Sequence, residues 1–280
     1  MSRTLLIAGV GYLGSEVQRQ AENSGWEVIG ITKSGGDNQL ACDLSSLDAV
    51  TTLAKSLDVQ PTAIVHCASS GRGGADAYKT VFVHGCAHLQ KAFPATPLLF
   101  VSSSSVYGQT DGSTITEDAP TQPDRETSQL LLTAEKSVLT EGGCVARLAG
   151  IYGPGRSIIL QRLLAGTAGI EDDGSRILNQ IHRNDAASAI LHLLSTTPFP
   201  AGEIFNVADS TPLRQVDCYR SLADQFNKPL PPTVQRNMNR KRAWTNKRVS
   251  NAKLCRTGWS PAFPDFRQAA PAVAETLGKR

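Results

Sequence analysis

The feature that most constrains this chain is a glycine-rich hexapeptide near its N-terminus, Gly9-Val10-Gly11-Tyr12-Leu13-Gly14. It follows a short apolar run that is typical of a strand, and it precedes a helical pattern at residues 15–24. In a strand–turn–helix unit, the first glycine permits a tight turn, the second admits a diphosphate and the third allows close helix packing. Free N–H groups at the helix start favour anions. The motif therefore predicts a Rossmann unit that binds a dinucleotide through Gly9, Gly11, Tyr12, Leu13 and Gly14.

Short apolar runs alternate with longer helical patterns through the first half of the chain. The runs are Leu5–Val10, Val28–Ile31, Ala63–Ala68, Leu98–Val101 and Val145–Leu148. This alternation predicts an α/β fold with a doubly wound parallel sheet. We expect residues 1–150 to form the Rossmann domain, residues 181–210 to return to it, and residues 151–180 and 211–280 to form a smaller C-terminal substrate lobe.

The second half of the chain shows weaker patterns. We predict helices at residues 158–165, 185–195 and 213–226 and a strand at residues 204–207. Asn184 or Asp185 is expected to cap the second of these helices. The proline-rich segment 228–232 is incompatible with regular structure.

The end of the second strand bears on the choice between NAD and NADP. An NAD site favours a carboxylate about 20 residues after the glycine motif, but no acid lies between Glu27 and Asp37. Thr32, Lys33 and Ser34 occupy this place instead, and a lysine there favours the 2′-phosphate of NADP. We therefore predict NADP as the preferred cofactor, with NAD as the alternative.

Further segments, in order, resemble the extended short-chain dehydrogenases/reductases, that is, the NAD-dependent epimerase/dehydratase family. They are Cys42-Asp43-Leu44, Val65-His66-Cys67-Ala68-Ser69, the serine-rich segment ending Val106-Tyr107-Gly108, Arg147 to Gly155, residues 179–187 and 204–207, and the closing segment 249–261. The pattern is most similar to the atypical YeeZ-like subgroup. The resemblance implies adenine contacts from Asp43 and Leu44, and further cofactor contacts from Cys67, Ala68, Ser69 and Ser102.

The chain lacks the tyrosine and lysine that the resemblance would lead one to expect. In the family, a YxxxK pair performs acid–base chemistry beside the nicotinamide. Anchoring on Ala134-Glu135 puts Thr127 and Leu131 at these positions, and no YxxxK occurs anywhere in the chain. A family asparagine is likewise replaced by Phe82. The usual proton relay cannot be built from these residues.

A few polar residues remain as catalytic or substrate candidates. Ser103 falls at the family's serine position and could bind substrate or stabilise a turn; Tyr107 could be a substitute acid or a packing residue. His66, at a strand end, is more typical of a structural group. Arg156 could contact an anion or be solvated. In the basic stretch 236–248, Arg242 could bind a phosphate-bearing substrate, with a solvated face and nucleic acid as the other interpretations.

Composition limits the binding partners, metal sites and cellular location that we expect for this chain. A formal net charge of +3 over 280 residues is too small to indicate nucleic acid or an anionic membrane. The six cysteines form no CxxC pair, which predicts reduced thiols, no metal site and a cytoplasmic location. No apolar stretch approaches a membrane span.

Two functions fit these observations. The first is an atypical NAD(P)-dependent epimerase- or reductase-like enzyme that acts on a nucleotide sugar or similar small molecule. The second is a catalytically silent NADP(H)-binding sensor or scaffold. A polar pocket beside the nicotinamide would favour the enzyme, and one filled by Phe82 and Leu131 would favour the binder.

Overall fold

The computed structural model describes residues 3–71, 73–236 and 244–278. The chain divides into two compact units, each built from several chain segments. Unit 1 comprises Met1–Val106, Asp124–Arg147 and Ala187–Phe205, and unit 2 comprises Tyr107–Pro123, Leu148–Ala186 and Asn206–Arg280. Residues 107–123 belong to unit 2, whereas the domain range predicted from the sequence included them in the Rossmann part. The predicted domain ranges themselves stay a prediction.

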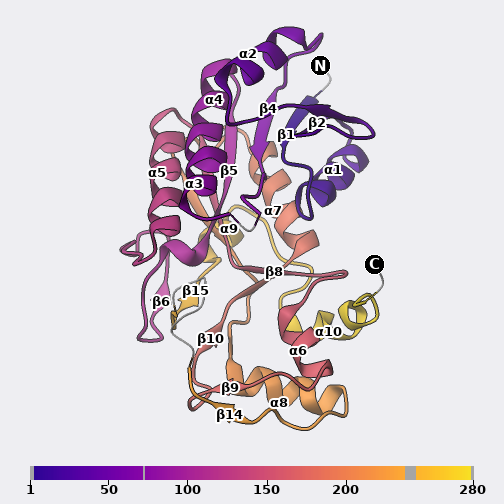
Figure 1. Cartoon of the computed structure of the whole chain (residues 1–280), viewed down its shortest axis with the longest axis vertical. Helices are drawn as coiled ribbons and strands as arrows, with labels where there is room; N and C mark the ends of the chain where they lie inside the picture. The colour runs from indigo at the N-terminus through magenta and orange to yellow at the C-terminus, as the bar shows by residue number, and fades with distance from the viewer. Residues whose placement is uncertain (1–2, 72, 237–243, 279–280) are drawn as a thin grey trace. The chain divides into compact units, whose positions relative to one another are not determined.

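A seven-stranded sheet forms the centre of unit 1, in the order β12-β7-β5-β4-β1-β2-β3 (Figure 1). Its strands are β1 (Arg3–Ala8), β2 (Trp26–Thr32), β3 (Gln39–Ala41), β4 (Ala63–His66), β5 (Leu98–Ser103), β7 (Cys144–Leu148) and β12 (Ile204–Val207). The ladders from β5 to β3 are parallel. Strands β1, β4 and β7 are almost entirely buried because helices cover both faces, which explains their continuous apolar sequences.

Helices cover both faces of this sheet. Figure 1 shows α1 and α7 on one face and α2, α4 and α5 on the other. The helical segments are α1 (Gly14–Asn23), α2 (Leu47–Ser56), α3 (Ala75–Tyr78), the π-helix η1 (Lys79–His84), α4 (Gly85–Ala92), the 3₁₀ turn η2 (Ser104–Val106), α5 (Glu126–Thr140) and α7 (Arg183–Ser195). Ser46 caps α2 by accepting a hydrogen bond from Ala49 N, as expected for serine at a helix start. This layered arrangement is the predicted doubly wound α/β fold.

Unit 2 has its own hydrophobic core, in which α6 (Ile158–Leu164), α8 (Gln215–Gln225) and α10 (Phe266–Ala274) pack together. In the described part of unit 2, strands of two or three residues also pair into four small sheets. The strands are β6 (Thr114–Ile115), β8 (Gly150–Tyr152), β9 (Ile170–Glu171), β10 (Ile177–Leu178), β11 (Gln180–His182), β13 (Leu213–Arg214), β14 (Thr233–Val234) and β15 (Arg248–Val249), and α9 spans Ala252–Arg256. The largest core side chains include Tyr152 and Phe266, whose rings pack edge to face with their centres 4.7 Å apart.

Most elements predicted from local patterns are present, but one cap assignment was wrong. Helix α7 begins at Arg183, so neither Asn184 nor Asp185 precedes it. The carboxylate of Asp185 instead accepts hydrogen bonds from the backbone N–H groups of Ala262 and Phe263, both at 2.9 Å. A contact between segments 77 residues apart has no local signature, so the acidic residue resembled an ordinary cap.

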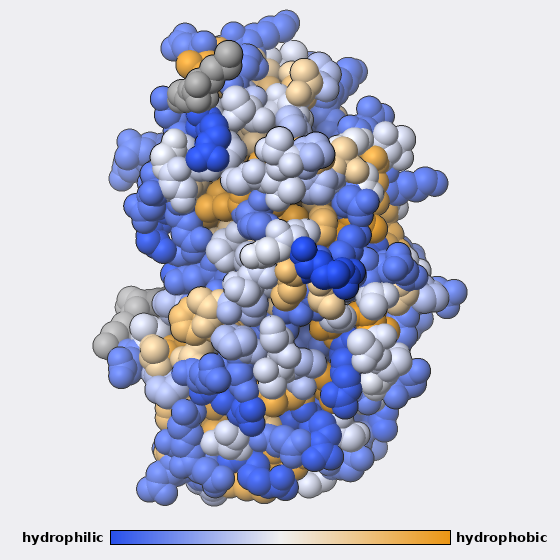
Figure 2. All heavy atoms as spheres, turned by 180° about the vertical axis from the view of Figure 1, so that it is seen from behind, coloured by the Kyte–Doolittle hydropathy of each residue, from blue (hydrophilic) through white to orange (hydrophobic). Residues whose placement is uncertain are grey.

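The surface and the cysteines agree with a folded chain that buries its apolar residues. On the face drawn in Figure 2, hydrophobic residues form separate small areas among hydrophilic ones. All six cysteines are free, and four of them are buried. No helix in the described ranges is both long enough and apolar enough to cross a bilayer.

Candidate dinucleotide site

The turn between β1 and α1 depends on two of its glycines for purely steric reasons. Gly9 has a φ of +102°, and a Cβ there would overlap the backbone of Ala68. A Cβ on Gly14 would overlap the carbonyl oxygen of Gly9. Gly9 N also donates to Ile31 O at 2.9 Å, which ties the turn to β2. These two positions therefore require glycine for the fold itself.

Gly11 differs from the other two glycines of the motif. A Cβ on Gly11 would meet no atom within 4 Å, so the fold does not require glycine there. Helix α1 starts beside it, and its N-cap, Leu13, provides no side-chain hydrogen bond. Open space beside Gly11 and a helix start without a side-chain cap are what a bound diphosphate needs. The residues present thus fit a dinucleotide.

An ion pair joins the loop after β2 to the loop after β3. Lys33 Nζ lies 3.0 Å from Asp43 Oδ2, with the lysine side chain 82% exposed. Ser45 donates to Asp43 Oδ1 from its backbone N–H at 2.9 Å and its hydroxyl at 2.7 Å. The hydrogen bonds from Ser45, together with Lys33, lower the pKa of Asp43 to about 2. Ser34 is exposed, and Thr32 Oγ1 donates to Gly35 O at 3.1 Å.

The end of β4 supplies the next wall of the predicted site. Ala68 lies against Gly9, as the glycine geometry requires, and Ser69 is exposed. Cys67 N donates to Ala8 O at 2.8 Å, and burial raises the pKa of its thiol to about 12. His66 is fully buried, with Nε2 2.9 Å from Val81 O, and burial lowers its pKa to about 4. Burial therefore keeps His66 neutral, as expected of a structural histidine.

A buried ion pair lies behind the end of β5. Glu135, on α5, accepts from Arg147 Nη2 at 2.6 Å and from Arg147 Nε at 3.1 Å, and both side chains are at most 5% exposed. Ser102 Oγ donates to Glu135 Oε1 at 2.5 Å. The Ser102 hydroxyl thus has a partner in the interior, where it helps to hold α5 against β5 and β7, and the cofactor contact expected of Ser102 stays a prediction.

Hydroxyl groups gather at the start of α5 and the end of β5. Ser103 is half-buried, and its Oγ accepts from Ser105 N at 3.2 Å. Ser128 Oγ donates to Ser105 Oγ at 3.3 Å, which connects α5 to the turn η2. Ser103 therefore already stabilises a turn, although its partial exposure leaves it accessible to a ligand.

The face of α5 that should carry the catalytic pair is apolar at its centre. Thr127, Leu131 and Glu135 follow one another at four-residue spacing on one face. Leu131 is 4% exposed and Thr127 is half-buried. Phe82, at the family's asparagine position, is 8% exposed and packs on the rings of His66 and Phe100. No ammonium or phenol occupies these places.

Three further predicted site residues belong to unit 2 and play other roles or are not described. Tyr107 has no exposed surface and donates its hydroxyl to Asn206 Oδ1 at 2.9 Å, which makes it a structural group. Arg156 is exposed at the end of a turn that its backbone closes with Gly153. Arg242 lies outside the described residues.

Sequence reasoning missed several charged groups of unit 2. Lys247 is 5% exposed, donates to Tyr107 O at 2.7 Å, and has a pKa lowered to about 8 by burial. Asp209 is 2% exposed with one carboxyl oxygen unpaired, and burial raises its pKa to about 8. Lys247 lay within the basic stretch noticed in the sequence, but its burial had no local pattern.

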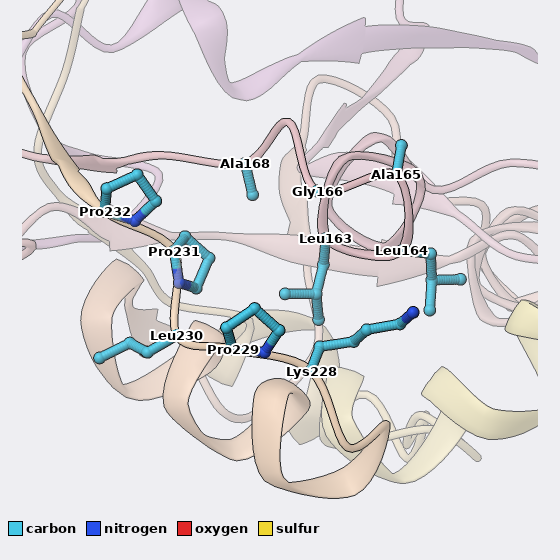
Figure 3. Close-up of a pocket in the computed structure, with 10 residues that line it drawn as sticks. All are labelled: Leu163, Leu164, Ala165, Gly166, Ala168, Lys228, Pro229, Leu230, Pro231 and Pro232. Carbon is cyan, nitrogen blue, oxygen red and sulfur yellow. The ribbon is translucent and has the colours of Figure 1, made fainter.

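A hollow of about 300 Å³ in unit 2 is lined by none of the predicted site residues that the structure describes. Figure 3 shows its lining, which comes from the end of α6 and from the proline-rich segment. The lining is apolar apart from Lys228. Among the residues described, this hollow therefore contributes nothing to the dinucleotide site in unit 1.

Most of the chain matches one known protein family. The model of the NAD dependent epimerase/dehydratase family matches residues 5–208. The chain belongs to this family. The match covers the glycine turn, the serine-rich strand end and α5, so the family is recognised even though its Tyr/Lys pair is absent here.

Curated relatives and solved structures extend the similarity over the whole chain. Protein YeeZ of Escherichia coli K12 is 27% identical, over 94% of this chain and 97% of YeeZ. Methionine adenosyltransferase 2 subunit beta of Danio rerio is 24% identical, over 83% of this chain and 78% of that protein.

Among solved structures, a putative NAD-dependent epimerase/dehydratase from Methylobacillus flagellatus superposes with a TM-score of 0.79 at 27% identity, over 98% of both chains. Two others share the fold: a dTDP-glucose 4,6-dehydratase from Bacillus anthracis in complex with NAD (TM-score 0.81, 20% identity, 100% of this chain and 97% of the other) and RMD from Pseudomonas aeruginosa with NADPH (TM-score 0.76, 24% identity, 99% and 97%).

Proposed function

We propose that this chain is an NADP(H)-binding protein that performs no proton transfer of the family type, and that cofactor occupancy itself is its output. Leu131 carries the proposal, because an apolar side chain only 4% exposed stands where the family places its lysine. Phe82 supports it, since it fills the neighbouring polar position with a ring packed on His66 and Phe100. Both positions belong to the core, whereas the glycine turn keeps its open cradle.

The proposed binding site follows from the residues of unit 1. The amides at the start of α1 would hold the diphosphate beside Gly11, and Lys33 would receive a 2′-phosphate. The nicotinamide supplies a hydride acceptor or donor when it is bound. Ser103 and Thr127 carry hydroxyls, and Leu131 stands at the family's lysine position, so these hydroxyls can donate and accept hydrogen bonds but cannot hold a phenolate-like charge.

The relatives are compatible with a role other than turnover. One similar protein is named as a subunit of a methionine adenosyltransferase, that is, as one component of a larger enzyme. A cofactor-sensing or scaffold role for this chain would resemble that arrangement. The structures solved with NAD and with NADPH support either dinucleotide as ligand.

A second candidate function is an atypical oxidoreductase or epimerase that acts on a nucleotide sugar or a similar phosphate-bearing molecule. The partial exposure of Ser103 favours this function. A charged cluster of unit 2, made of Arg236, Trp244 and Asp172, favours it too. In this cluster Arg236 Cζ lies 4.5 Å from the centre of the Trp244 ring, and Arg236 Nε lies 2.5 Å from Asp172 Oδ2. Such a protein would take its proton from water or from the substrate itself.

Two measurements separate these functions. In a thermal-shift titration, NADPH should raise the melting temperature progressively, because it binds only the folded chain. Absence of a shift with both NADPH and NADH at millimolar concentration would remove both candidate functions. A panel of sugar nucleotides with NADPH or NADP should then give no change in absorbance at 340 nm, and turnover of any of them would establish the enzyme instead.

A further inference from the structure

The segment that joins β2 to α2 carries one cation and two carboxylates. Lys33 follows β2, Asp37 lies in a tight turn next to Asn38, which has a φ of +59°, and Asp43 follows β3. The turn is closed by backbone hydrogen bonds between Gly36 and Gln39 at 3.1 and 3.2 Å. Lys33 is the single positive charge between Arg19 and Lys55. Within this segment, an electrostatic preference for a 2′-phosphate can come only from Lys33.

The structure assigns a carboxylate partner to that lysine. Lys33 Nζ lies 3.0 Å from Asp43 Oδ2, and Asp43 is itself held by two hydrogen bonds from Ser45. The carboxylate is therefore fixed, whereas the long lysine side chain, 82% exposed, is free to change its rotamer. No comparable bond joins Lys33 to Asp37 among the ion pairs of the described residues.

We propose that Asp43 sets the cofactor preference of this chain by tethering Lys33, so that the protein accepts both NADP(H) and NAD(H) with only a modest preference for the phosphorylated form. The proposal rests on the proposed function, because it concerns the same crevice. It makes Asp43 a positioning residue for Lys33, in addition to any contact with the adenine.

The physical reason is a competition for one ammonium group. With NAD(H), Lys33 keeps its bond to Asp43, and nothing is lost on binding. With NADP(H), the lysine must leave Asp43 or share itself between a carboxylate and a phosphate monoester of charge about −1.5 to −2. Since Asp43 Oδ2 lies 3.0 Å from Lys33 Nζ, a 2′-phosphate bound by Lys33 would also be within one Debye length of this carboxylate and would be repelled by it. Both effects reduce the gain from the 2′-phosphate.

The test uses the ratio of the dissociation constants for NADH and NADPH, measured by calorimetry on the full-length chain. This ratio cancels contacts that both cofactors make, including any adenine contact of residue 43. Asp43→Asn is nearly isosteric, and its amide oxygen can still accept both hydrogen bonds from Ser45. Asp37→Asn is the matched control, because it removes the same charge from the same segment without touching Lys33.

We expect Asp43→Asn to raise the preference for NADPH about threefold to fivefold and Asp37→Asn to change it by less than about twofold. Lys33→Met should reduce the preference about tenfold, since charge-assisted bonds to phosphate are strong. In the Lys33→Met background, the Asp43→Asn effect should shrink to the size of the Asp37→Asn effect, because the tether has lost its lysine.

Three outcomes would overturn the proposal. Equal effects of Asp43→Asn and Asp37→Asn would show general charge repulsion without a tether. An unchanged or lowered ratio in Asp43→Asn would show that Lys33 does not compete. An Asp43→Asn effect that persists at full size without Lys33 would assign the discrimination to another group. In each case the wild type still binds a dinucleotide, whereas failure of the proposed function would leave the wild type without a thermal shift with either cofactor.

Discussion

The glycine turn after β1 and the helix α5 lie in the same compact unit. They differ in whether they retain the residues that the family uses there. The turn keeps the glycine geometry that the family's motif predicts: positive φ at Gly9, close packing at Gly14 and open space at Gly11. Helix α5 keeps its place in the fold through Glu135, but it carries Thr127 and Leu131 where chemistry would require a tyrosine and a lysine.

The difference reflects how each function is encoded. Binding at the turn uses backbone amides and the absence of side chains, and the same glycines are needed for the strand and the helix to pack. Catalysis on α5 uses two side chains that the fold does not need, so they can be replaced while the helix stays in position. A chain can therefore lose the chemistry and still bind the dinucleotide.

The largest expected effect comes from breaking the anchor of α5. Glu135→Ala leaves the Arg147 guanidinium, 5% exposed, without its carboxylate, and should lower the free energy of unfolding by about 3–5 kcal/mol in urea denaturation. Glu126→Ala, at the exposed first turn of the same helix, is the matched control and should change it by less than about 0.5 kcal/mol.

A further variant separates charge pairing from packing in that anchor. Glu135→Leu combined with Arg147→Met removes both charges and keeps apolar volume, so it should recover most of the lost stability. If Glu135→Ala were as mild as Glu126→Ala, the pair would not hold α5, and the comparison between a fixed helix and replaceable side chains would fail.

The next effect divides the glycine motif into its structural and ligand-binding parts. Gly14→Ala should lower the free energy of unfolding by about 2–3 kcal/mol, because its Cβ would overlap Gly9 O. Gly11→Ala should leave the melting temperature without ligand nearly unchanged, since a Cβ there meets no protein atom. The Gly11 variant should nevertheless weaken NADPH binding at least about tenfold, because its methyl group occupies the cradle.

An unchanged affinity of the Gly11→Ala protein for NADPH would contradict this prediction. It would show that the open space beside Gly11 is not used and that the diphosphate binds elsewhere. Thermal shift measures the melting temperature without ligand and its rise with NADPH on the same samples.

Local patterns predicted the parts of this molecule that depend on neighbours in the sequence. The strands at Leu5–Val10 and Ala63–Ala68 were predicted because they are short apolar runs, and the glycine turn because its spacing is diagnostic. The bond from Glu135 to Arg147 and the pair of Lys33 with Asp43 were not predicted. Each joins residues on different elements, and the register of those elements is fixed only when the sheet is complete.

The same limit explains what was missed at single residues. Asp185 was interpreted as a helix cap, but its partners are backbone groups at residues 262 and 263. The cofactor contact of Ser102 stays a prediction, but no local pattern indicated that its hydroxyl donates to Glu135. Polar residues near strand or helix ends are common in sites and in structural contacts alike, and only the three-dimensional partner distinguishes the two.

A smaller effect tests whether α5 has adapted to an apolar residue. Leu131→Lys should lower the free energy of unfolding by about 1–2 kcal/mol, because a cation would be placed in a position only 4% exposed. Leu131→Met keeps the volume and should cost less than about 1 kcal/mol. A lysine variant as stable as wild type would mean that the position still accommodates the family's ammonium, and that the loss of the catalytic pair has not been followed by repacking.

The smallest expected effect concerns Ser103, and it distinguishes the two candidate functions most directly. For a cofactor binder, Ser103→Ala removes only the hydroxyl that accepts from Ser105 N, so the dissociation constant for NADPH should change by less than about twofold. Ser56→Ala, at an exposed position at the end of α2, provides a reference for loss of a surface hydroxyl. A wild-type protein that consumes NADPH with a sugar nucleotide, and that loses this turnover in Ser103→Ala but keeps its affinity for NADPH, would contradict the binder. The serine would then act on a substrate oxygen, and α5 would have lost its tyrosine and lysine without the site having lost its chemistry.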